Sequence, residues 1–325
     1  MLDLVRLSPR RIFPPGGVDL CRQIAVLTEM SEEDEVLGVA CSKGVSLGYY
    51  VDEVGVTASG VENDPRMVEE AEAWAREAGV AGRLQFQSGR SDALPYRDEI
   101  FDIAIGEIGL ANHCEPHDAV RELVRVTKPG GFVVLVQLVW KAPVDEVRQR
   151  VLSEHLGARP MMVVEWKRLL RECGVQDVHT EDWSDEETSF RAGVVKPFPD
   201  FAEIFSLPEK MGVLRRAWRR WGWQGVRTVL ERESEVHRLL TSERILGLDL
   251  LRGRKAPADG DERAAREPAG RREPDTVPGA HVEQPAEKAG VTAAVDASRG
   301  GETAGLPLFA PDRSRKGGAP ETGEP

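Results

Sequence analysis

The sequence predicts an α/β fold built around a mainly parallel sheet, and two observations support that prediction. Short apolar runs alternate with amphipathic helical patterns from Val36 to Trp183, which is typical of strand–helix–strand units. The run Phe132–Val139 is rich in β-branched residues and apolar on both faces, as in an interior strand covered by helices. Ligands of such sheets bind at the carboxyl ends of the strands, so we expect a site there.

The predicted strands are short and bounded by turn residues. The first, Val36–Ala40, is too short and too apolar to be an exposed strand. The last, Ile245–Arg252, follows a region in which the alternation of strands and helices breaks down. Between these two we expect strands at 57–61, 84–87, 101–105, 132–139 and 175–183.

The predicted helices have recognisable starts and stops. Asp64 is a good N-cap, Pro65 suits the first helical position, and Gly79 ends that helix. The turn Lys128-Pro129-Gly130-Gly131 ends another, because proline and paired glycines cannot continue a helix. We expect helices at 18–30, 44–54, 65–78, 116–127 and 160–173, and a mostly helical region at 184–244.

Composition limits the folded part of the chain. From Ala256 onward the sequence is dominated by Gly, Pro, Ala and charged residues, with Phe309 as the one aromatic side chain. Such a segment cannot bury enough apolar surface to offset its ordering entropy, so we expect 256–325 to be disordered. The remaining stretch of about 255 residues is long enough for one well-buried core with additions.

Charge and cysteine usage exclude several classes of protein. The formal net charge is −12, which argues against a general nucleic-acid-binding role. Cys21, Cys41, Cys114 and Cys173 lie far apart without a CxxC pair, which argues against a disulfide framework or a zinc site and fits a reducing compartment. The sequence has no apolar run of signal-peptide or membrane-spanning type. We therefore expect a soluble cytoplasmic protein without a metal ion.

The stretch Val36–Gly44 is the centre of the predicted site, because a strand there stops at small residues and a helix follows. It lacks the GxGxxG pattern, so a nicotinamide dehydrogenase is a weak interpretation. Glu62 ends the next predicted strand, where a carboxylate can accept both hydroxyl protons of a ribose. Taken alone, Glu62 is more simply a surface residue at a strand end. Together with the small-residue turn, it favours ribose binding.

Four segments in order resemble the class I S-adenosylmethionine-dependent methyltransferases, of the type 11-like branch that methylates small molecules and quinone-type lipids. Each segment is a weak signal, but the four together at this spacing are specific for the fold. They are Val36–Gly44, Gly60–Met67, Gly89–Tyr96 with Phe101–Ile105, and Leu123–Phe132.

The resemblance implies a Rossmann-like, doubly wound and mostly parallel seven-stranded sheet, with one antiparallel strand near Ile245–Arg252. The implied organisation is an N-terminal arm and helix (1–30), an S-adenosylmethionine-binding core (31–183), a helical insertion or lid (184–244), the last core strand (245–255) and a disordered tail (256–325). The implied cofactor is S-adenosyl-L-methionine, and its binding residues are Ala40, Cys41, Ser42, Gly44, Glu62, Asn63, Ser91, Asp92 and Glu107.

The sequence departs from the family pattern at four positions. Gly38 stands where the family usually has an acid, and Ala40 and Ser42 stand where it usually has glycines. Arg90 stands where the family often has an acid that accepts from the adenine amino group, and arginine cannot accept a hydrogen bond. Two alternatives follow: Ser91 or Asp92 takes over that contact, or the contact is missing.

The segment after the fourth strand is expected to adjoin the reacting methyl group. Glu107, Asn112 and His113 are candidates to hold or deprotonate an acceptor. The simpler interpretation is that Glu107 and Asn112 tie the loop together and that His113 is exposed. Many methyl transfers need only alignment of the nucleophile, so a catalytic base is not required.

Two functions of different classes remain open. The first is methyl transfer to a small-molecule or lipid-like acceptor, and the second is a methyltransferase-fold protein without catalysis that acts as a binding or regulatory partner. The residues Trp218 and Trp221, among several arginines, have three interpretations: packing onto the sheet, a lid over the acceptor, or peripheral contact with a membrane surface. Packing onto the sheet is the simplest of these. The oligomeric state is open.

Overall fold

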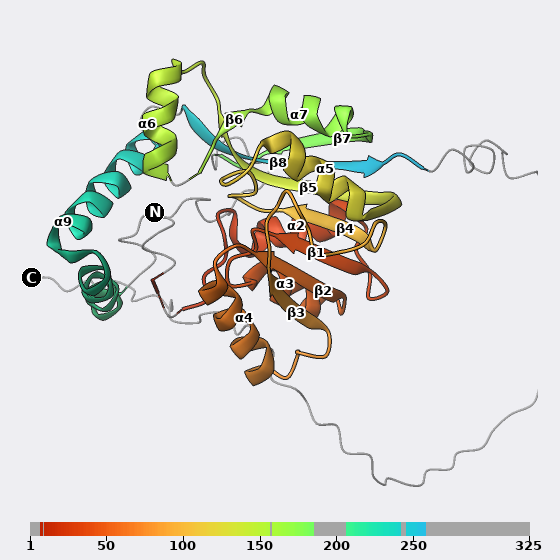
Figure 1. Ribbon diagram of the computed structural model, residues 1–325, viewed down its shortest axis with the longest axis horizontal. Helices are drawn as coiled ribbons and strands as arrows, with labels where there is room; N and C mark the ends of the chain where they lie inside the picture. The colour runs from red at the N-terminus through yellow and green to blue at the C-terminus, as the bar shows by residue number, and fades with distance from the viewer. Residues whose placement is uncertain (1–6, 9, 157, 185–205, 242–244, 258–325) are drawn as a thin grey trace, which may run out of the picture. The chain divides into compact units, whose positions relative to one another are not determined.

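The computed structural model describes residues 7–8, 10–156, 158–184, 206–241 and 245–257 (Figure 1). All of these residues belong to one compact unit, 1–257. The expected disordered tail lies outside the described residues except for Ala256 and Pro257, and so does the stretch 185–205 of the expected insertion.

A mixed sheet with the strand order β3-β2-β1-β4-β5-β8-β7 forms the centre of the unit (Figure 1). Strand β8 runs antiparallel to both of its neighbours, and the other pairs in the sheet are parallel. The predicted seven-stranded sheet with one antiparallel strand is confirmed; a two-residue strand, β6, pairs additionally with β5. The strands are β1 Glu35–Val39, β2 Thr57–Glu62, β3 Leu84–Ser88, β4 Phe101–Gly106, β5 Thr127–Trp140, β6 Met161–Met162, β7 Val175–Asp182 and β8 Leu246–Lys255.

Helices cover the two faces of the sheet. The unit β1–α3–β2 steps toward one edge and β4–α5–β5 steps toward the other, so right-handed connections place α3 and α5 on opposite faces. Helix α2 packs on α3, and α7 packs on α5, β7 and β8. The helices are α2 Gly17–Leu27, α3 Val45–Glu53, α4 Pro65–Glu77, α5 Pro116–Val126, α6 Glu146–Leu156, α7 Val163–Glu172 and α9 Leu207–Thr241.

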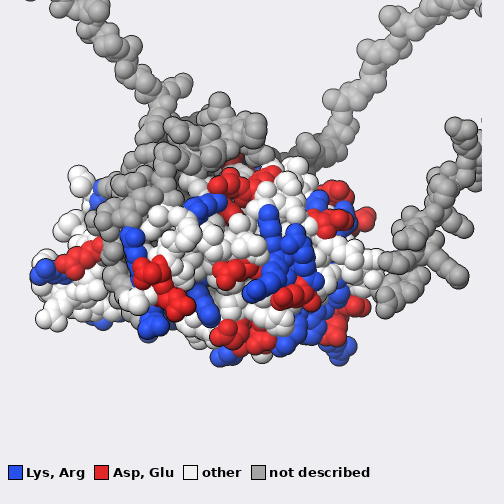
Figure 2. Space-filling model, turned by 90° about the horizontal axis from the view of Figure 1, so that it is seen from above, with Lys and Arg blue, Asp and Glu red and all other residues white. Residues whose placement is uncertain are grey.

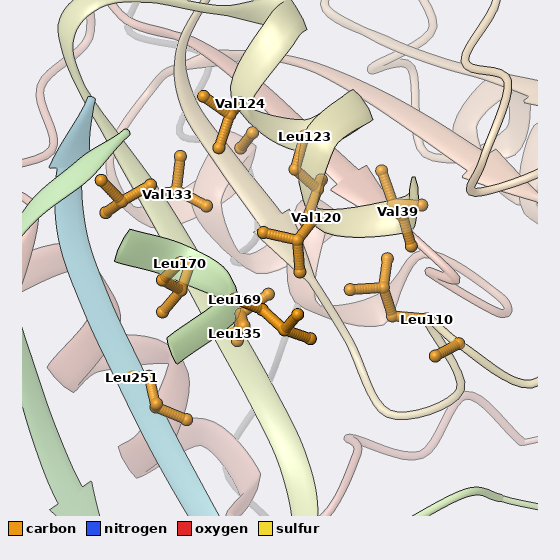
Figure 3. Close-up of a cluster of buried hydrophobic side chains, with 14 of the residues drawn as sticks. Val39, Leu110, Val120, Leu123, Val124, Val133, Leu135, Leu169, Leu170 and Leu251 are labelled. Atoms are coloured by element: carbon orange, nitrogen blue, oxygen red, sulfur yellow. The ribbon is translucent and has the colours of Figure 1, made fainter. Parts of the chain in front are cut away.

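The core on the α5 and α7 face explains why these segments fold as they do. Every residue of β5 from Phe132 to Trp140 is buried, as the two-sided apolar pattern predicts. Figure 3 shows Val133 and Leu135 of β5 meeting Leu123 of α5 and Leu170 of α7 between the layers. Burial of each such side chain contributes about 1.5–3 kcal/mol, so this cluster holds the strands in their order.

The helix α4 begins as its sequence predicts. The Asp64 carboxylate accepts a hydrogen bond from the backbone N–H of Arg66 at 3.0 Å, and Pro65 occupies the first helical position. This start fixes the chain immediately after β2. The residues that follow Glu62 are therefore held close to the carboxyl ends of the strands.

Two helices lie beside the sheet where the sequence was less informative. Helix α6 had not been predicted, and it contacts α9 (Figure 1). Helix α9 is interrupted by Gly222, whose φ of 69° and ψ of −177° are not helical. Glycine adopts such angles readily, so the helix bends there.

The described surface carries both signs of charge. On the face seen in Figure 2, basic and acidic side chains lie close to one another. Among the described residues, no helix is both long and apolar enough to cross a membrane. The same residues include no group of His, Cys, Asp and Glu side chains arranged to hold a metal ion.

Candidate functional site

The turn after β1 has an unusual backbone. Ala40, Ser42 and Gly44 all have left-handed φ angles, of 58°, 52° and 64°. Only Gly44 adopts this conformation without strain; a side chain there would also place Cβ 2.2 Å from the ring of Phe86. For Ala40 and Ser42 the left-handed conformation costs about 1–2 kcal/mol each. The turn thus keeps a backbone that glycine usually supplies, although two of the three positions carry side chains.

Glu62, the last residue of β2, is bound into this turn. One carboxylate oxygen accepts a hydrogen bond from the backbone N–H of Ser42 at 2.8 Å. The other accepts from the N–H groups of Asn63 and Asp64 at 2.9 and 3.1 Å. The side chain is buried, with 6% of its surface exposed. Each carboxylate oxygen has more than one lone pair, so a fixed carboxylate can still accept from a ligand.

Gly38 stands where the family usually has an acid, and the side chain of Leu47 packs against it. A Cβ atom at Gly38 would lie 3.0 Å from both methyl groups of Leu47, which is fully buried. An acidic side chain would need Leu47 to move and would lie in an apolar environment, at a high cost in desolvation. In this protein Leu47 therefore fills the space that a side chain at position 38 would need.

A pocket of about 200 Å³ opens at the carboxyl ends of β1, β2 and β4. Strands β1 and β4 are neighbours in the sheet, and the order of the chain reverses between them, so this is the switch point at which ligands bind. Four segments line it: Ala40; Val61, Glu62, Asn63 and Asp64; Gly89, Arg90, Ser91 and Asp92; and Gly109, Leu110, Asn112, His113 and Cys114.

Arg90 and Asp92 form an ion pair at this pocket. The Arg90 guanidinium donates to both Asp92 oxygens, at 2.8 and 2.6 Å. This hydrogen-bonded pair lowers the pKa of the Asp92 carboxyl, and the pair also raises the pKa of Arg90. The arginine that replaces the family's acid is therefore held by a carboxylate two residues away.

Glu107 follows β4 but does not line the pocket. Its backbone N–H donates to the carbonyl of Val39 at 3.0 Å, and only 8% of the residue is exposed. Burial raises the pKa of Glu107 to about 7; a hydrogen bond with Ser46 opposes the rise, and the charge of Glu62 adds to it. Gln137 donates to the backbone carbonyls of Gly106 and Glu107, at 3.0 Å each, which fixes the chain as it leaves β4.

The structure brings five of the nine predicted cofactor-binding residues together in the pocket lining. Glu107 lies beneath the lining, and Ser42 contributes its backbone N–H to Glu62. The thiol of Cys41 is buried beside Gly60, where it packs, and burial raises its pKa well above the usual range. Gly44 caps the start of α3. The five in the lining are Ala40, Glu62, Asn63, Ser91 and Asp92.

Of the three catalytic candidates, Asn112 and His113 line the pocket and Glu107 does not. Several lining residues were not expected from the sequence. The signal for two of them was present, because Gly89 directly follows β3 and Gly109 lies three residues beyond the end of β4. A Cβ at Gly89 would meet Val61 at 2.9 Å, and Gly109 has a φ of 106°. The lining residues that were not predicted are Val61, Asp64, Gly89, Arg90, Gly109, Leu110 and Cys114.

The N-terminal arm holds the turn from outside, which the sequence did not predict. The Lys43 ammonium donates to the carbonyl of Ser8 at 2.6 Å. The Arg11 guanidinium donates to the carbonyl of Gly44 at 3.1 Å and lies 3.4 Å from the ring centroid of Trp74. Burial lowers the pKa of Arg11 to about 10. The arm and the turn therefore form one packed region.

Comparison with known proteins agrees with this geometry. Residues 37–135, which include the turn, Glu62 and the segments at 89–92 and 109–114, match a family described as a methyltransferase domain. The methyltransferase GfsG of Streptomyces halstedii is 28% identical over 170 residues, covering 48% of this chain and 61% of that protein. The chain thus spans less than two thirds of the length of this relative.

Solved structures share the fold. The cyclase SpnF superposes with a TM-score of 0.58 at 23% identity, covering 74% of this chain and 82% of that one. Geranyl diphosphate C-methyltransferase from Streptomyces coelicolor A3(2), in complex with Mg²⁺, geranyl diphosphate and S-adenosyl-L-homocysteine, gives a TM-score of 0.51 at 13% identity, covering 74% and 79%. At these identities the likeness concerns the fold.

The chain contains a class I S-adenosylmethionine-dependent methyltransferase domain, which confirms the family predicted from the four segments. S-adenosylmethionine is the cofactor of this class, so the predicted cofactor is confirmed as well. The residues present fit such a group, because the buried carboxylate of Glu62 faces the pocket at the switch point.

Proposed function

We propose that this protein transfers a methyl group from S-adenosylmethionine to a small-molecule or lipid-like acceptor. The observation that carries the proposal is Glu62, whose carboxylate lines the pocket while three backbone N–H groups fix its orientation. The oxygen that accepts only from Ser42 keeps a lone pair free, with which it can accept a hydrogen bond from a ribose hydroxyl. The relative GfsG, named a methyltransferase, supports the same reaction class.

Different lining residues would bind different parts of the cofactor. Glu62 would bind the ribose. Ser91 and Asp92 would contact the adenine, because these two residues line the pocket from the loop after β3. Leu110 supplies an apolar wall. The cofactor, when bound, supplies an electrophilic methyl group. The chain itself supplies orientation and the exclusion of water.

The acceptor would approach from the segment after β4. Asn112 and His113 line the pocket there and offer hydrogen bonds that can align a nucleophile. Alignment alone accelerates a bimolecular displacement strongly, so the proposal does not require either residue to remove a proton. Attack through oxygen, carbon or nitrogen is equally compatible with these residues. The small-molecule and lipid-like range of the acceptor is supported by the geranyl diphosphate bound to the neighbour from Streptomyces coelicolor.

A labelling experiment tests the proposal. The full chain would be incubated with methyl-labelled S-adenosylmethionine and fractionated extract of its own source, and labelled products would be identified by mass. We expect a labelled product that disappears in the variant Glu62→Ala. A protein that binds the cofactor tightly but labels no component of any fraction would contradict methyl transfer.

A second function, binding or regulation without methyl transfer, is favoured by one observation. Arg90 occupies both oxygens of Asp92, so that carboxylate is already paired before any ligand arrives. The cyclase SpnF also shows that the fold serves proteins not named as methyltransferases. Cofactor binding without turnover in the labelling experiment is the outcome that this function predicts.

We also propose a reducing, cytoplasmic location. The four cysteines are free thiols, and those of Cys21 and Cys41 are buried with pKa values raised by burial. Buried thiols of this kind persist without oxidation in a reducing compartment. Fractionation of cells that express the tagged full chain would check the location.

A further inference from the structure

Before the bend at Gly222, three large apolar side chains of α9 are exposed to solvent. Leu207, Met211 and Trp218 expose 76%, 67% and 61% of their surface. At 3.6 residues per turn they lie within about 40° of one another around the helix axis. They therefore form one continuous stripe, which we call the outer stripe, rather than scattered single residues.

The side of α9 that adjoins the outer stripe, beginning at Leu214, is already occupied. Val213, Ala217 and Val226 are buried together, and Leu7 and Ile12 of the N-terminal arm pack against them with Leu214 and Trp221. Trp218 and Trp221 were expected to pack onto the sheet, but Trp218 is exposed and Trp221 packs against this cluster instead. The outer stripe is thus not needed for the attachment of α9.

The arm also fixes α9 through polar contacts. The Arg216 guanidinium donates to the carbonyl of Leu7 at 2.8 Å, and Arg10 pairs with Glu209 at 3.3 Å. The orientation of α9 relative to the arm is therefore defined by packing and hydrogen bonds together. The outer stripe faces away from these contacts, because its residues are largely exposed.

The part of α9 that carries the outer stripe is rich in basic residues. Six basic residues and one acidic residue stand between Leu207 and Thr228, in a chain whose formal charge is −12. The one acid, Glu209, is the residue paired with Arg10. Arg215 and Arg219 lie beside the stripe, and neither has an ion-pair partner among the residues that the structure describes. Beyond the bend at Gly222, Trp223 exposes 72% of its surface.

We infer that the outer stripe of α9, with Arg215 and Arg219, binds the surface of an anionic lipid bilayer. Leucine, methionine and tryptophan side chains enter the boundary between headgroups and acyl chains, where tryptophan is favoured. Arginine pairs with lipid phosphates in both charge and geometry. The inference is independent of the proposed methyl transfer.

The chemistry of the stripe favours lipid over nucleic acid or an acidic protein. Phosphate backbones attract arginine but give exposed leucine and methionine side chains nothing apolar to contact. The net negative charge of the chain further disfavours a long polyanion, whereas a membrane contact involves only the few residues that face it. Attachment along the surface also needs no membrane-spanning helix.

Vesicle co-sedimentation of the full chain tests the inference. Vesicles of phosphatidylglycerol mixed with phosphatidylcholine would be compared with vesicles of phosphatidylcholine alone, at low and at high ionic strength. We expect sedimentation with the anionic vesicles at low ionic strength, weakened by salt. Absence of sedimentation under those conditions, or equal binding to both kinds of vesicle, would overturn it.

Variants separate the stripe from the rest of the surface. Arg215→Glu and Arg219→Glu should each lower the partition coefficient at least about fivefold, as expected for one basic residue near an anionic surface. Trp218→Ala should also lower it. Matched controls on α7 are Arg168→Glu and Val164→Ala, whose side chains are exposed and which should bind as the parent does. Equal loss in the controls, or stronger binding to duplex RNA than to anionic vesicles, would count against the inference.

Discussion

Ala40 and Ser42 show at the scale of single residues how the turn departs from its family while keeping its shape. Both have left-handed φ angles, although each carries a Cβ atom that opposes them. The contacts of Glu62 with Ser42 and the packing of Phe86 on Gly44 hold the turn against this strain. The sequence indicated the substitutions, but only the structure shows that both positions adopt left-handed φ angles.

Replacing Ala40 by glycine should therefore stabilise the protein. The free energy gained by relieving the left-handed strain is larger than the free-energy cost of the extra conformational entropy that glycine gives the unfolded chain. We therefore expect the free energy of unfolding to rise by about 1 kcal/mol. Urea denaturation measures it. The control Ala73→Gly, in the helix α4, should lose about 1 kcal/mol instead. A loss of stability at Ala40 similar to that at Ala73 would contradict the strain.

The buried acid Glu107 should make stability depend on pH. Its pKa is raised to about 7 in the folded protein and returns to an ordinary value near 4.5 on unfolding, so the folded state holds the proton more tightly. Stability is then highest below the unfolded pKa and falls as pH rises toward about 7. The negative charge of Glu107 also contributes to the raised pKa values of three neighbouring groups, the thiols of Cys21 and Cys41 and the phenol of Tyr50.

The variant Glu107→Gln should remove that pH dependence. It cannot ionise, so at about pH 8 we expect it to be more stable than the parent by about 1–3 kcal/mol, and near pH 5 to differ little. Denaturation curves across that range provide the measurement. Parallel stability profiles for parent and variant would show that Glu107 does not carry the effect.

At the scale of elements, the turn and helix α3 depend on one glycine. Gly44 combines a left-handed φ with close contact to Phe86 of β3. Gly79, after α4, has a φ of 72°, but a Cβ atom added there would meet nothing within 4 Å. The two glycines therefore separate backbone strain from steric overlap.

Alanine at these two glycines should have unequal effects. Gly79→Ala adds strain alone and should cost about 1–2 kcal/mol of unfolding free energy. Gly44→Ala adds overlap with Phe86 and should cost at least about 1 kcal/mol more. Urea denaturation of both variants compares them. Equal costs would mean that Phe86 moves aside freely and that the turn is less constrained than its contacts indicate.

The elements also show what a sequence can predict. The positions of the strands and the carboxyl-end site followed from local patterns, because apolar runs and the cap at Asp64 act within a few residues. The segment Lys128–Gly131, expected as a turn, lies instead within β5. The unpredicted contacts join distant segments, such as Lys43 to Ser8 and Arg11 to Gly44. Nothing in the local pattern of either segment specifies its partner. For the same reason the burial of Glu107, which depends on α2 and α3, was not foreseen.

At the scale of the whole molecule, the turn after β1, the arm and α9 are joined in series. Lys43 and the carbonyl of Gly44 contact the arm, and the arm contacts α9 through Leu7 and Arg10. The lipid contact inferred for α9 would thus act on an element two contacts away from the turn after β1. This connection is made of packed and hydrogen-bonded residues of the described chain.

The measurement that tests the central claim most directly is calorimetric titration with S-adenosylhomocysteine. The parent protein should bind, and Glu62→Ala should bind about 10- to 100-fold more weakly, as expected from the loss of charge-assisted hydrogen bonds. Glu69→Ala, an exposed acid on α4, is the control and should bind as the parent does. Absence of binding by the parent at millimolar ligand, or equal binding by parent and Glu62→Ala, would contradict the claim that this pocket is the cofactor site.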